Sequence, residues 1–227
     1  MLIKTSLGAA SDTAGYIQAR LPLLPVPAIP EIRLHQAQKS SGLSRFADNG
    51  EHSPYWAYAW AGGAALARYL LDHPEMVAGE LVLDLGTGSG LVAIAAAKAG
   101  AREIIGTDID PVALVALSLN TAANGVEVTG LLADLATADP VAADLIVAAD
   151  LFYEQRLAEQ TTRFLDRCLE SGAQVLIGDP WRAWLPLARL RLLADYAVPD
   201  FGDGKGGAVT RSGVFALKPS QRMAYSV

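Results

Sequence analysis

The chain has 227 residues, of which 52% are hydrophobic and 19% are charged. This length suits one compact domain with a terminal extension, and the large apolar content excludes an intrinsically disordered chain. The formal net charge of -6 provides no basic surface for a polyphosphate backbone, so we expect no nucleic-acid partner.

Cysteine and histidine usage narrows the class of protein further. The single cysteine, Cys168, excludes an internal disulfide, and His35, His52 and His73 lie in separate segments without the spacing of metal ligands. No apolar run approaches the ~20 residues that a membrane-spanning helix needs. Lys4 is followed by polar residues where a secretory signal would be apolar. We therefore expect a cytoplasmic protein without a metal site or a membrane partner.

The N-terminal quarter of the chain differs from the rest. Residues 1–53 lack sustained periodicity, and four prolines within residues 22–30 favour extended segments over a helix. We expect these residues to form an arm or lid on a domain that spans residues 54–227. At the start of that domain, Pro54 suits the first turn of a helix over residues 55–72.

From residue 81 onward, short apolar runs alternate with helical stretches, a pattern typical of a parallel sheet with crossover helices. Five buried strands are expected at residues 81–85, 103–107, 126–132, 144–149 and 174–178. Helices are expected at residues 91–99, 111–124, 154–170 and 183–194.

The C-terminal end of the chain breaks this alternation. Two strands, at residues 196–200 and 209–217, are separated by a glycine-rich linker too short for a crossover helix. Such a linker suits only antiparallel pairing. The expected fold is therefore α/β, with a seven-stranded sheet that is mostly parallel and ends in an antiparallel hairpin.

The strongest motif is Asp-Leu-Gly-Thr-Gly-Ser-Gly at residues 84–90, where the first strand meets its helix. Gly86, Gly88 and Gly90 permit unusual backbone angles and a close approach of a ligand to the helix N-terminus. The spacing differs from the Gly-x-Gly-x-x-Gly of dinucleotide folds and from a P-loop, which makes a phosphate cradle the weaker interpretation. Asp84 would repel a phosphate but can accept a hydrogen bond from an amino group.

Further carboxylates follow the next three strands. Asp108 ends the second strand, a position from which a carboxylate can accept hydrogen bonds from both ribose hydroxyls. Asp134 and Leu135 follow the third strand and suit the amine and the ring of adenine. Asp150 follows the fourth. Because the carboxyl ends of parallel strands meet at one crevice, this set predicts a nucleoside ligand that carries positive charge.

These motifs resemble those of the class I S-adenosylmethionine-dependent methyltransferases, over residues 54–218. The resemblance implies a Rossmann-like sheet with helices on both faces and S-adenosylmethionine as cofactor. Residues 150–153, Asp-Leu-Phe-Tyr, look like the Asp-x-x-Tyr motif of the seven-strand protein lysine methyltransferases. Residues 22–35, 54–63 and 107–111 are similar to the lysine methyltransferases of the electron transfer flavoprotein β subunit.

The resemblance also implies a role for individual residues. The methionine part of the cofactor would lie at the glycine turn, the ribose at Asp108 and the adenine at Asp134. The implied cofactor contacts are Trp60, Asp84, Gly86, Thr87, Gly88, Gly90, Asp108, Ile109, Asp134, Leu135 and Asp150. Asp150 would orient or partly neutralise the acceptor ammonium, and Tyr153 would shape the channel, so these two are the implied catalytic residues.

The same resemblance implies an acceptor site and a partner. The implied substrate contacts are Tyr55, Trp56, Tyr153, Asp179 and Trp181. The implied partner is a protein substrate, the electron transfer flavoprotein β subunit, modified by a monomeric enzyme.

Other interpretations of the same residues stay open at this point. Asp134 could cap a helix, and Asp150 could cap the helix after it with Tyr153 in the core. The aromatic residues from Tyr55 to Trp60 could pack on the sheet, and the segment 179–182 could cap the next helix. Asp110, before Pro111, is expected to be a helix cap.

Other functions also stay open. The chain could methylate another protein, as an enzyme resembling the ribosomal protein L11 methyltransferases would, or a small amine. It could bind a nucleoside without catalysis. A nicotinamide-dependent dehydrogenase is disfavoured by the glycine spacing.

Overall fold

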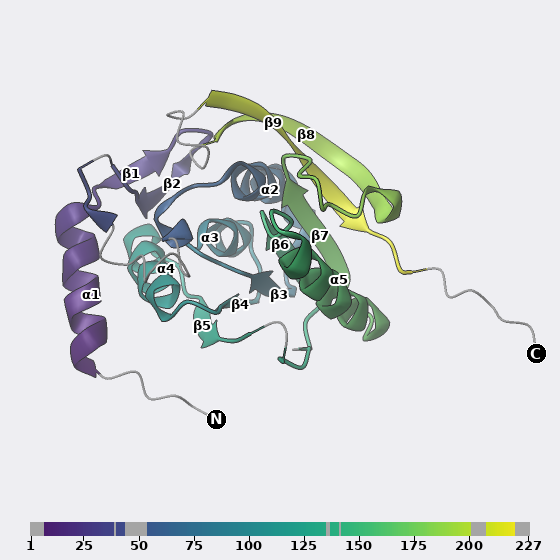
Figure 1. Cartoon of the computed structure of the whole chain (residues 1–227), viewed down its shortest axis with the longest axis horizontal. Coiled ribbons are helices and arrows are strands. Elements are labelled where there is room, and N and C mark those ends of the chain that lie inside the picture. Colours follow the sequence, from purple (N-terminus) through teal and green to yellow (C-terminus); the bar gives the residue numbers. More distant parts are fainter. Residues whose placement is uncertain are drawn as a thin grey trace, which may run out of the picture.

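The computed structural model describes residues 7–38, 40–43, 54–134, 137–140, 142–200 and 208–220. Its central sheet has seven strands in the order β5-β4-β3-β6-β7-β9-β8 (Figure 1). Five strands are parallel: β3 (Leu81–Leu85), β4 (Glu103–Asp108), β5 (Thr129–Leu132), β6 (Leu145–Ala149) and β7 (Gln174–Asp179). The antiparallel strands are β9 (Ala208–Leu217), which pairs with β7, and β8 (Leu190–Asp200), which pairs with β9. This architecture confirms the expected fold class, although the linker at residues 201–207 lies outside the described residues.

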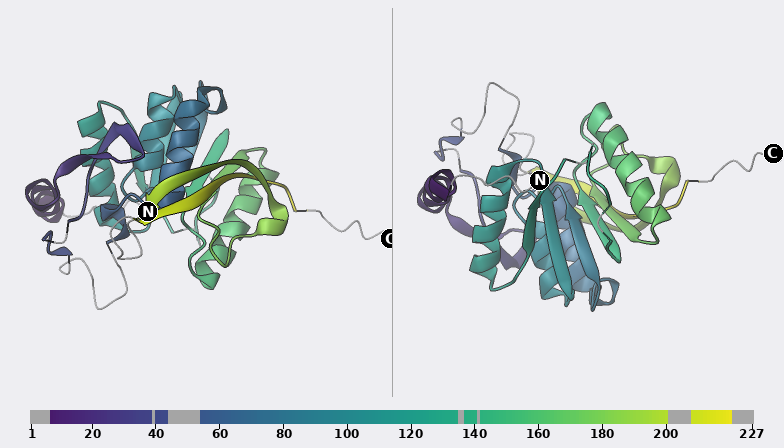
Figure 2. Two further views of the ribbon diagram at one scale, coloured as in Figure 1. Left: turned by 90° about the horizontal axis from the view of Figure 1, so that it is seen from above. Right: turned by 90° about the horizontal axis from the view of Figure 1, so that it is seen from below.

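Helices cover both faces of the sheet. On one face lie α2 (Ala61–Asp72), α3 (Leu91–Lys98) and α4 (Pro111–Asn124), and on the other lies α5 (Gln155–Glu170) (Figures 1 and 2). Because successive strand residues point to opposite faces, Val82 packs with the three helices and Leu83 packs with α5. The sheet is therefore buried on both sides, and its carboxyl edge remains open for a site.

The helix boundary at Asp110 follows its prediction. The Asp110 side chain accepts a hydrogen bond from the Val112 N–H at 2.8 Å, and Pro111 occupies the first turn of α4. The helix ends at Gly125, whose φ of 65° is left-handed.

The N-terminal segment is folded on the helical layer. It contains α1 (Leu7–Arg20) and an antiparallel hairpin of β1 (Leu23–Val26) and β2 (Ile29–His35). The expectation of extended structure was correct for the hairpin and wrong for α1. Ile17 and Leu21 of this segment are fully buried in a cluster with Trp56 and residues of α4, so tertiary packing stabilises a helix whose sequence shows little periodicity. Figure 1 shows α1 on the outer side of α4.

One other helix prediction was wrong, and one was correct only in part. Residues 183–194 form a short 3₁₀ helix, η4 (Leu187–Arg189), and the start of β8. Pro186 explains part of this difference, because a residue that precedes proline is disfavoured in the α conformation. The helix expected over residues 55–72 is divided into the 3₁₀ helix η2 (Tyr55–Ala57) and α2, while η3 (Pro74–Met76) follows α2.

Two features are absent from the residues that the structure describes. No helix there is long and apolar enough to cross a membrane. Nor does that part of the chain bring together three or more side chains of the kind that could hold a metal ion.

Candidate active site

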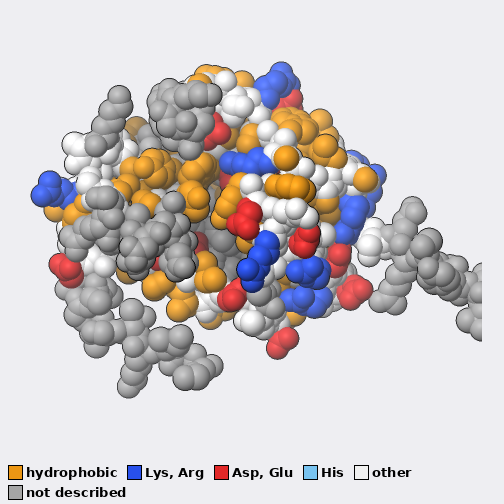
Figure 3. Space-filling model, in the orientation of Figure 1, with side chains coloured by type: hydrophobic (Ala, Val, Ile, Leu, Met, Phe, Trp, Pro, Cys, Tyr) orange, Lys and Arg blue, Asp and Glu red, His pale blue; other side chains and the backbone are white. Residues whose placement is uncertain are grey.

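A cavity of about 630 Å³ opens at the carboxyl ends of β3, β4 and β6. Figure 3 shows this face hollowed near its centre, with hydrophobic side chains on one side of the hollow and charged side chains on the other. The residues expected at the site that form its wall are Tyr55, Trp56, Trp60, Asp84, Gly86, Thr87, Gly88, Asp108, Ile109, Asp134, Asp150 and Tyr153. Gly90, Asp179 and Trp181 lie outside this wall, and Leu135 lies outside the described residues.

The glycine turn has the backbone that its sequence predicts. Gly86, Gly88 and Gly90 have φ values of 66°, 51° and 83°, all in the left-handed region that favours glycine. A Cβ atom on Gly88 would lie 3.7 Å from the Trp56 Cα, an ordinary van der Waals contact, so this glycine is set by its backbone angles and not by a lack of space. A Cβ atom on Gly90 would lie 2.5 Å from Leu117, which shows that this glycine lets the turn pack against α4.

Asp84 lies beneath the glycine turn. Its carboxylate accepts hydrogen bonds from the Thr87 hydroxyl at 2.7 Å and from the Ala93 N–H at 3.1 Å. Burial raises the pKa of Asp84 to about 6, although both hydrogen bonds favour the charged form. The residue therefore fixes the turn to the first residues of α3 and also places a carboxylate in the wall of the cavity.

Asp108 is attached to the same turn from the neighbouring strand. Its two carboxylate oxygens accept hydrogen bonds from the Gly88 N–H at 2.9 Å and the Asp110 N–H at 3.0 Å. Burial raises the pKa of Asp108, and these backbone hydrogen bonds oppose the rise. A carboxylate oxygen can accept more than one hydrogen bond, so Asp108 can also bind a ligand hydroxyl in the cavity.

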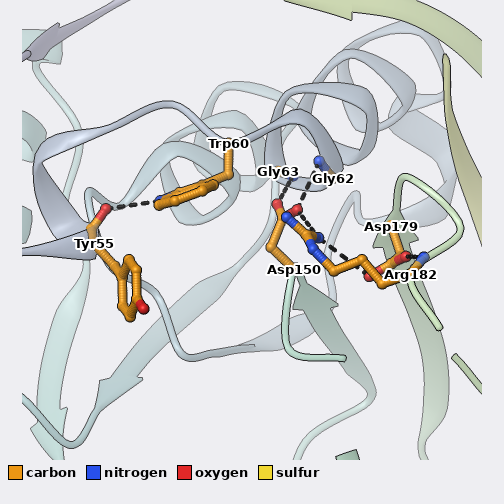
Figure 4. Close-up of polar contacts among 7 residues, drawn as sticks. All are labelled: Tyr55, Trp60, Gly62, Gly63, Asp150, Asp179 and Arg182. Atoms are coloured by element: carbon orange, nitrogen blue, oxygen red, sulfur yellow. Dashed lines mark hydrogen bonds and ion pairs between the residues drawn. The ribbon is translucent and has the colours of Figure 1, made fainter. Parts of the chain in front are cut away.

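Asp150 has an unexpected set of partners. Its carboxylate accepts hydrogen bonds from the N–H groups of Gly62 at 3.1 Å and Gly63 at 2.7 Å, at the start of α2 (Figure 4). Its backbone is left-handed, with a φ of 60°. The alternative in which Asp150 caps the helix after it is wrong, because Glu154 occupies that position and Tyr153 is 47% exposed.

Sequence reasoning gave no role to the two glycines that bind Asp150. A Cβ atom on Gly62 would lie 2.3 Å from the carbonyl oxygen of Gly178 and 2.7 Å from Asp150 Oδ2. Only glycine therefore lets α2 approach the end of β7 this closely. The Gly-Gly pair within a run of helix-forming residues was the feature of the sequence that could have indicated this close approach.

Aromatic side chains line the mouth of the cavity. Tyr55 lies 5.6 Å from Tyr153 and 5.4 Å from Trp60, measured between ring centroids, and the Trp60 indole N–H donates to the Tyr55 carbonyl at 2.8 Å (Figure 4). Tyr55 and Tyr153 are each 47% exposed, whereas Trp56 is buried. Trp56 is therefore part of the core, whereas Tyr55 and Tyr153 form a partly exposed wall of the cavity.

Asp179, the last residue of β7, and Trp181, in the loop after it, lie away from the wall. Asp179 is fully buried and accepts a hydrogen bond from the Arg182 N–H at 2.7 Å, so it caps this turn. Trp181 has a φ of 58° and packs edge-on against Phe215, with ring centroids 5.5 Å apart. Arg182 does line the cavity.

Comparisons with known proteins agree with this geometry. The sequence model of the family described as Ribosomal protein L11 methyltransferase matches residues 66–170. The chain is 40% identical over 172 residues to the electron transfer flavoprotein beta subunit lysine methyltransferase of Rattus norvegicus, covering 73% of this chain and 68% of that protein. The protein of that name from Homo sapiens is 38% identical over 180 residues, with 76% and 69% covered.

Solved structures give the same result for the fold. The structure of ribosomal protein L11 methylase from Lactobacillus delbrueckii subsp. bulgaricus matches with a TM-score of 0.52 and 25% identity, over 71% of this chain and 81% of that one. Magnesium protoporphyrin IX methyltransferase from Synechocystis PCC 6803, solved with bound S-adenosylmethionine, matches with a TM-score of 0.51 and 16% identity, over 79% and 92% of the two chains.

The glycine turn, the carboxylates at successive strand ends and the Asp-x-x-Tyr motif thus surround one cavity, as the resemblance implied. Together with the identity to the curated relatives, they place the chain in the electron transfer flavoprotein β subunit lysine methyltransferase family of S-adenosylmethionine-dependent protein lysine methyltransferases.

Proposed function

We propose that the chain transfers methyl groups from S-adenosylmethionine to lysine side chains of an electron transfer flavoprotein β subunit. One observation carries the proposal: a single cavity joins the glycine turn to Asp150 and Tyr153. A cofactor on the turn and a lysine entering past Tyr153 would therefore meet in the same space. The choice of protein substrate rests on the names of relatives with about 40% identity.

The wall of the cavity fits the cofactor. Asp108 would hold the ribose hydroxyls, Asp134 the adenine amine, and Asp84 with Gly88 the methionine part. Gly88 lines the cavity and has no side chain, so a ligand can approach the backbone there. When bound, S-adenosylmethionine supplies a methyl group on a positively charged sulfur, which is already an activated leaving group.

The protein's contribution is then mainly positioning, because methyl transfer requires a neutral amine in line with the methyl group. Asp150 is suited to orient an amine, since two backbone N–H groups fix its carboxylate. Tyr153 and Tyr55, packed against each other at the mouth, would limit the path of the lysine side chain.

The test of this function is methyl transfer from tritiated S-adenosylmethionine. The purified enzyme is incubated with a lysate of its own source that lacks the enzyme, and in parallel with purified electron transfer flavoprotein and purified ribosomal protein L11. We expect one labelled band in the lysate at the size of the flavoprotein β subunit, and methylated lysine in that subunit by mass spectrometry.

Purified ribosomal protein L11 tests the second candidate substrate. The L11 methyltransferase family model matches residues 66–170 of this chain, so L11 is the second candidate substrate. Label in L11 and none in the flavoprotein would refute the proposed substrate. Label in small amines alone would refute a protein substrate altogether.

A further inference from the structure

The side chain of Arg182 lies beside Asp150, at the place where the positively charged acceptor lysine would arrive. Its guanidinium forms an ion pair with Asp150 and lies 3.3 Å from Asp179 Oδ2 (Figure 4). These two ion pairs connect the segment after β6 to the end of β7. The side chains of Arg182 and Asp150 are 19% and 11% exposed. Both residues line the cavity, so the guanidinium faces the space that the acceptor amine would enter.

This pair bears on a chemical difficulty of the proposed reaction. A carboxylate beside an amine stabilises the ammonium form and raises the pKa of the amine, whereas methyl transfer needs the neutral form. An Asp150 carboxylate without a cationic partner would therefore hold the acceptor lysine in its unreactive state. A cation fixed on the same carboxylate opposes this effect, because like charges disfavour each other.

We propose that Arg182 is a positioning residue for methyl transfer: it holds Asp150 in place and supplies a fixed positive charge that favours the neutral acceptor amine. Asp150 then acts as a hydrogen-bond acceptor for the amine without stabilising an ammonium. This inference rests on the proposed function.

The surroundings of the pair keep both charges in place. In the part of the chain that the structure describes, Asp150 and Asp179 form ion pairs with Arg182, and the Tyr153 hydroxyl is a further titratable group that interacts with it electrostatically. The N-terminus of α2 contributes the N–H groups of Gly62 and Gly63 to the Asp150 carboxylate. Burial by itself would lower the pKa of Arg182, but the two carboxylates raise it above its ordinary value. Arg182 thus stays charged at every pH at which the enzyme is assayed.

The test compares the pH dependence of kcat in the wild type, Arg182→Gln and Arg182→Lys, with purified electron transfer flavoprotein β subunit as substrate. The kcat profile reports ionisations of the enzyme–substrate complex, including that of the bound amine. In R182Q we expect the midpoint of the rise in kcat to move up by about one pH unit or more, so that kcat falls about tenfold near pH 7.5 and recovers near pH 10. R182K, which keeps the charge, should retain most of the wild-type profile.

Arg189→Gln is the matched control. Arg189, the last residue of η4, forms an ion pair with Asp166 of α5, with side chains 22% and 31% exposed, and lies outside the cavity wall. R189Q should leave the midpoint where the wild type has it. The dissociation constant of S-adenosylmethionine, measured by calorimetry without the protein substrate, should change less than about threefold in R182Q, because the cofactor contacts remain.

Each other outcome overturns the proposal. An unchanged R182Q profile removes the role of Arg182, and an equal loss of kcat at every pH shows a structural role only. If R182Q does not fold, the wild-type profile still decides, because a midpoint at or above the ordinary lysine pKa of about 10.4 contradicts a favoured neutral amine. A wild type that does not methylate the flavoprotein refutes the proposed function itself, which is a distinct result.

Discussion

The Asn120 side chain donates a hydrogen bond to the carbonyl of Ser89, at 2.7 Å, inside the glycine turn. The same amide accepts a hydrogen bond from the backbone N–H of His35 in β2, at 2.8 Å. Asn120 is fully buried in α4. One side chain thus links the N-terminal hairpin directly to the turn that would hold the cofactor.

This link predicts that Asn120→Leu weakens cofactor binding. The substitution leaves the Ser89 carbonyl and the His35 N–H without their partner, which costs about 1–3 kcal/mol of stability for each buried group left unsatisfied. We expect a lower unfolding midpoint in denaturant and a loss of S-adenosylmethionine affinity of about fivefold or more, measured by calorimetry.

Asn124→Ala is the comparison for this prediction. Asn124 bonds to the backbone of Arg33 in β2, at 3.0 Å and 2.6 Å, and does not reach the glycine turn. Its removal should lower stability while the cofactor affinity stays the same. Equal losses of affinity in N120L and N124A would show that the link through Ser89 has no special importance.

The ionisation of Asp84 predicts a pH-dependent affinity for the cofactor. Burial raises the pKa of this carboxyl to about 6, and only its charged form attracts a cationic ligand. The affinity for S-adenosylmethionine should therefore be complete above pH 7 and fall as the pH drops through 6, by at most about tenfold per pH unit. Calorimetric titrations from pH 5 to pH 8 measure this change.

The stability of the enzyme without cofactor should change with pH in the direction opposite to the cofactor affinity. Because the native pKa of Asp84 lies above its ordinary value of 3.8, the native state binds the proton more tightly than the unfolded state. The stabilisation that this group provides is present at low pH and is lost as the pH rises through about 6.

The control for the affinity prediction is Asp84→Asn. This variant should remove the pH dependence of the cofactor affinity; a dependence that persists in D84N would assign it to another group.

Asp150→Asn tests the proposed acceptor site. The amide oxygen of asparagine can still accept a hydrogen bond from Gly63, so the variant disturbs α2 less than alanine would. We expect kcat to fall about 100-fold or more, in line with the loss of a positioning or proton-transfer group, while the cofactor still binds. Stopped-flow or steady-state assays with the flavoprotein substrate measure the loss. Full activity in D150N would exclude Asp150 from the reaction.

The close approach of α2 to β7 predicts that Gly62→Ala is damaging. The new Cβ would lie 2.3 Å from the carbonyl oxygen of Gly178, a contact that requires the backbone to move and displaces the partner of Asp150. We expect a loss of about 1–3 kcal/mol in stability, measured by urea unfolding, together with reduced activity.

Gly15→Ala in α1 is the matched helical control. A Cβ atom there would meet nothing within 4 Å. Because alanine favours the helix over glycine by up to about 1 kcal/mol, G15A should keep its activity and gain slightly in stability. A Gly62→Ala variant that is as stable and as active as G15A would contradict the steric argument.

Much of this molecule could be predicted from the local sequence. The alternation of apolar runs with helical stretches, and the short linker before β9, determined a mostly parallel sheet with an antiparallel end, because periodicity and linker length depend only on neighbouring residues. The glycines at residues 86–90 and the aspartates at strand ends determined where the site lies, since parallel strands end at one edge.

Only the tertiary structure decided the partners of the side chains in that site. Asp150 binds Gly62 and Gly63 across 87 residues or more of sequence, and no pattern within either segment specifies that contact. The ion pair with Arg182, the helix α1 stabilised by Trp56 and the strand β8 in place of a helix depend likewise on long-range packing. Such contacts form between distant segments and override local propensity, so the chain reveals them only when it is folded.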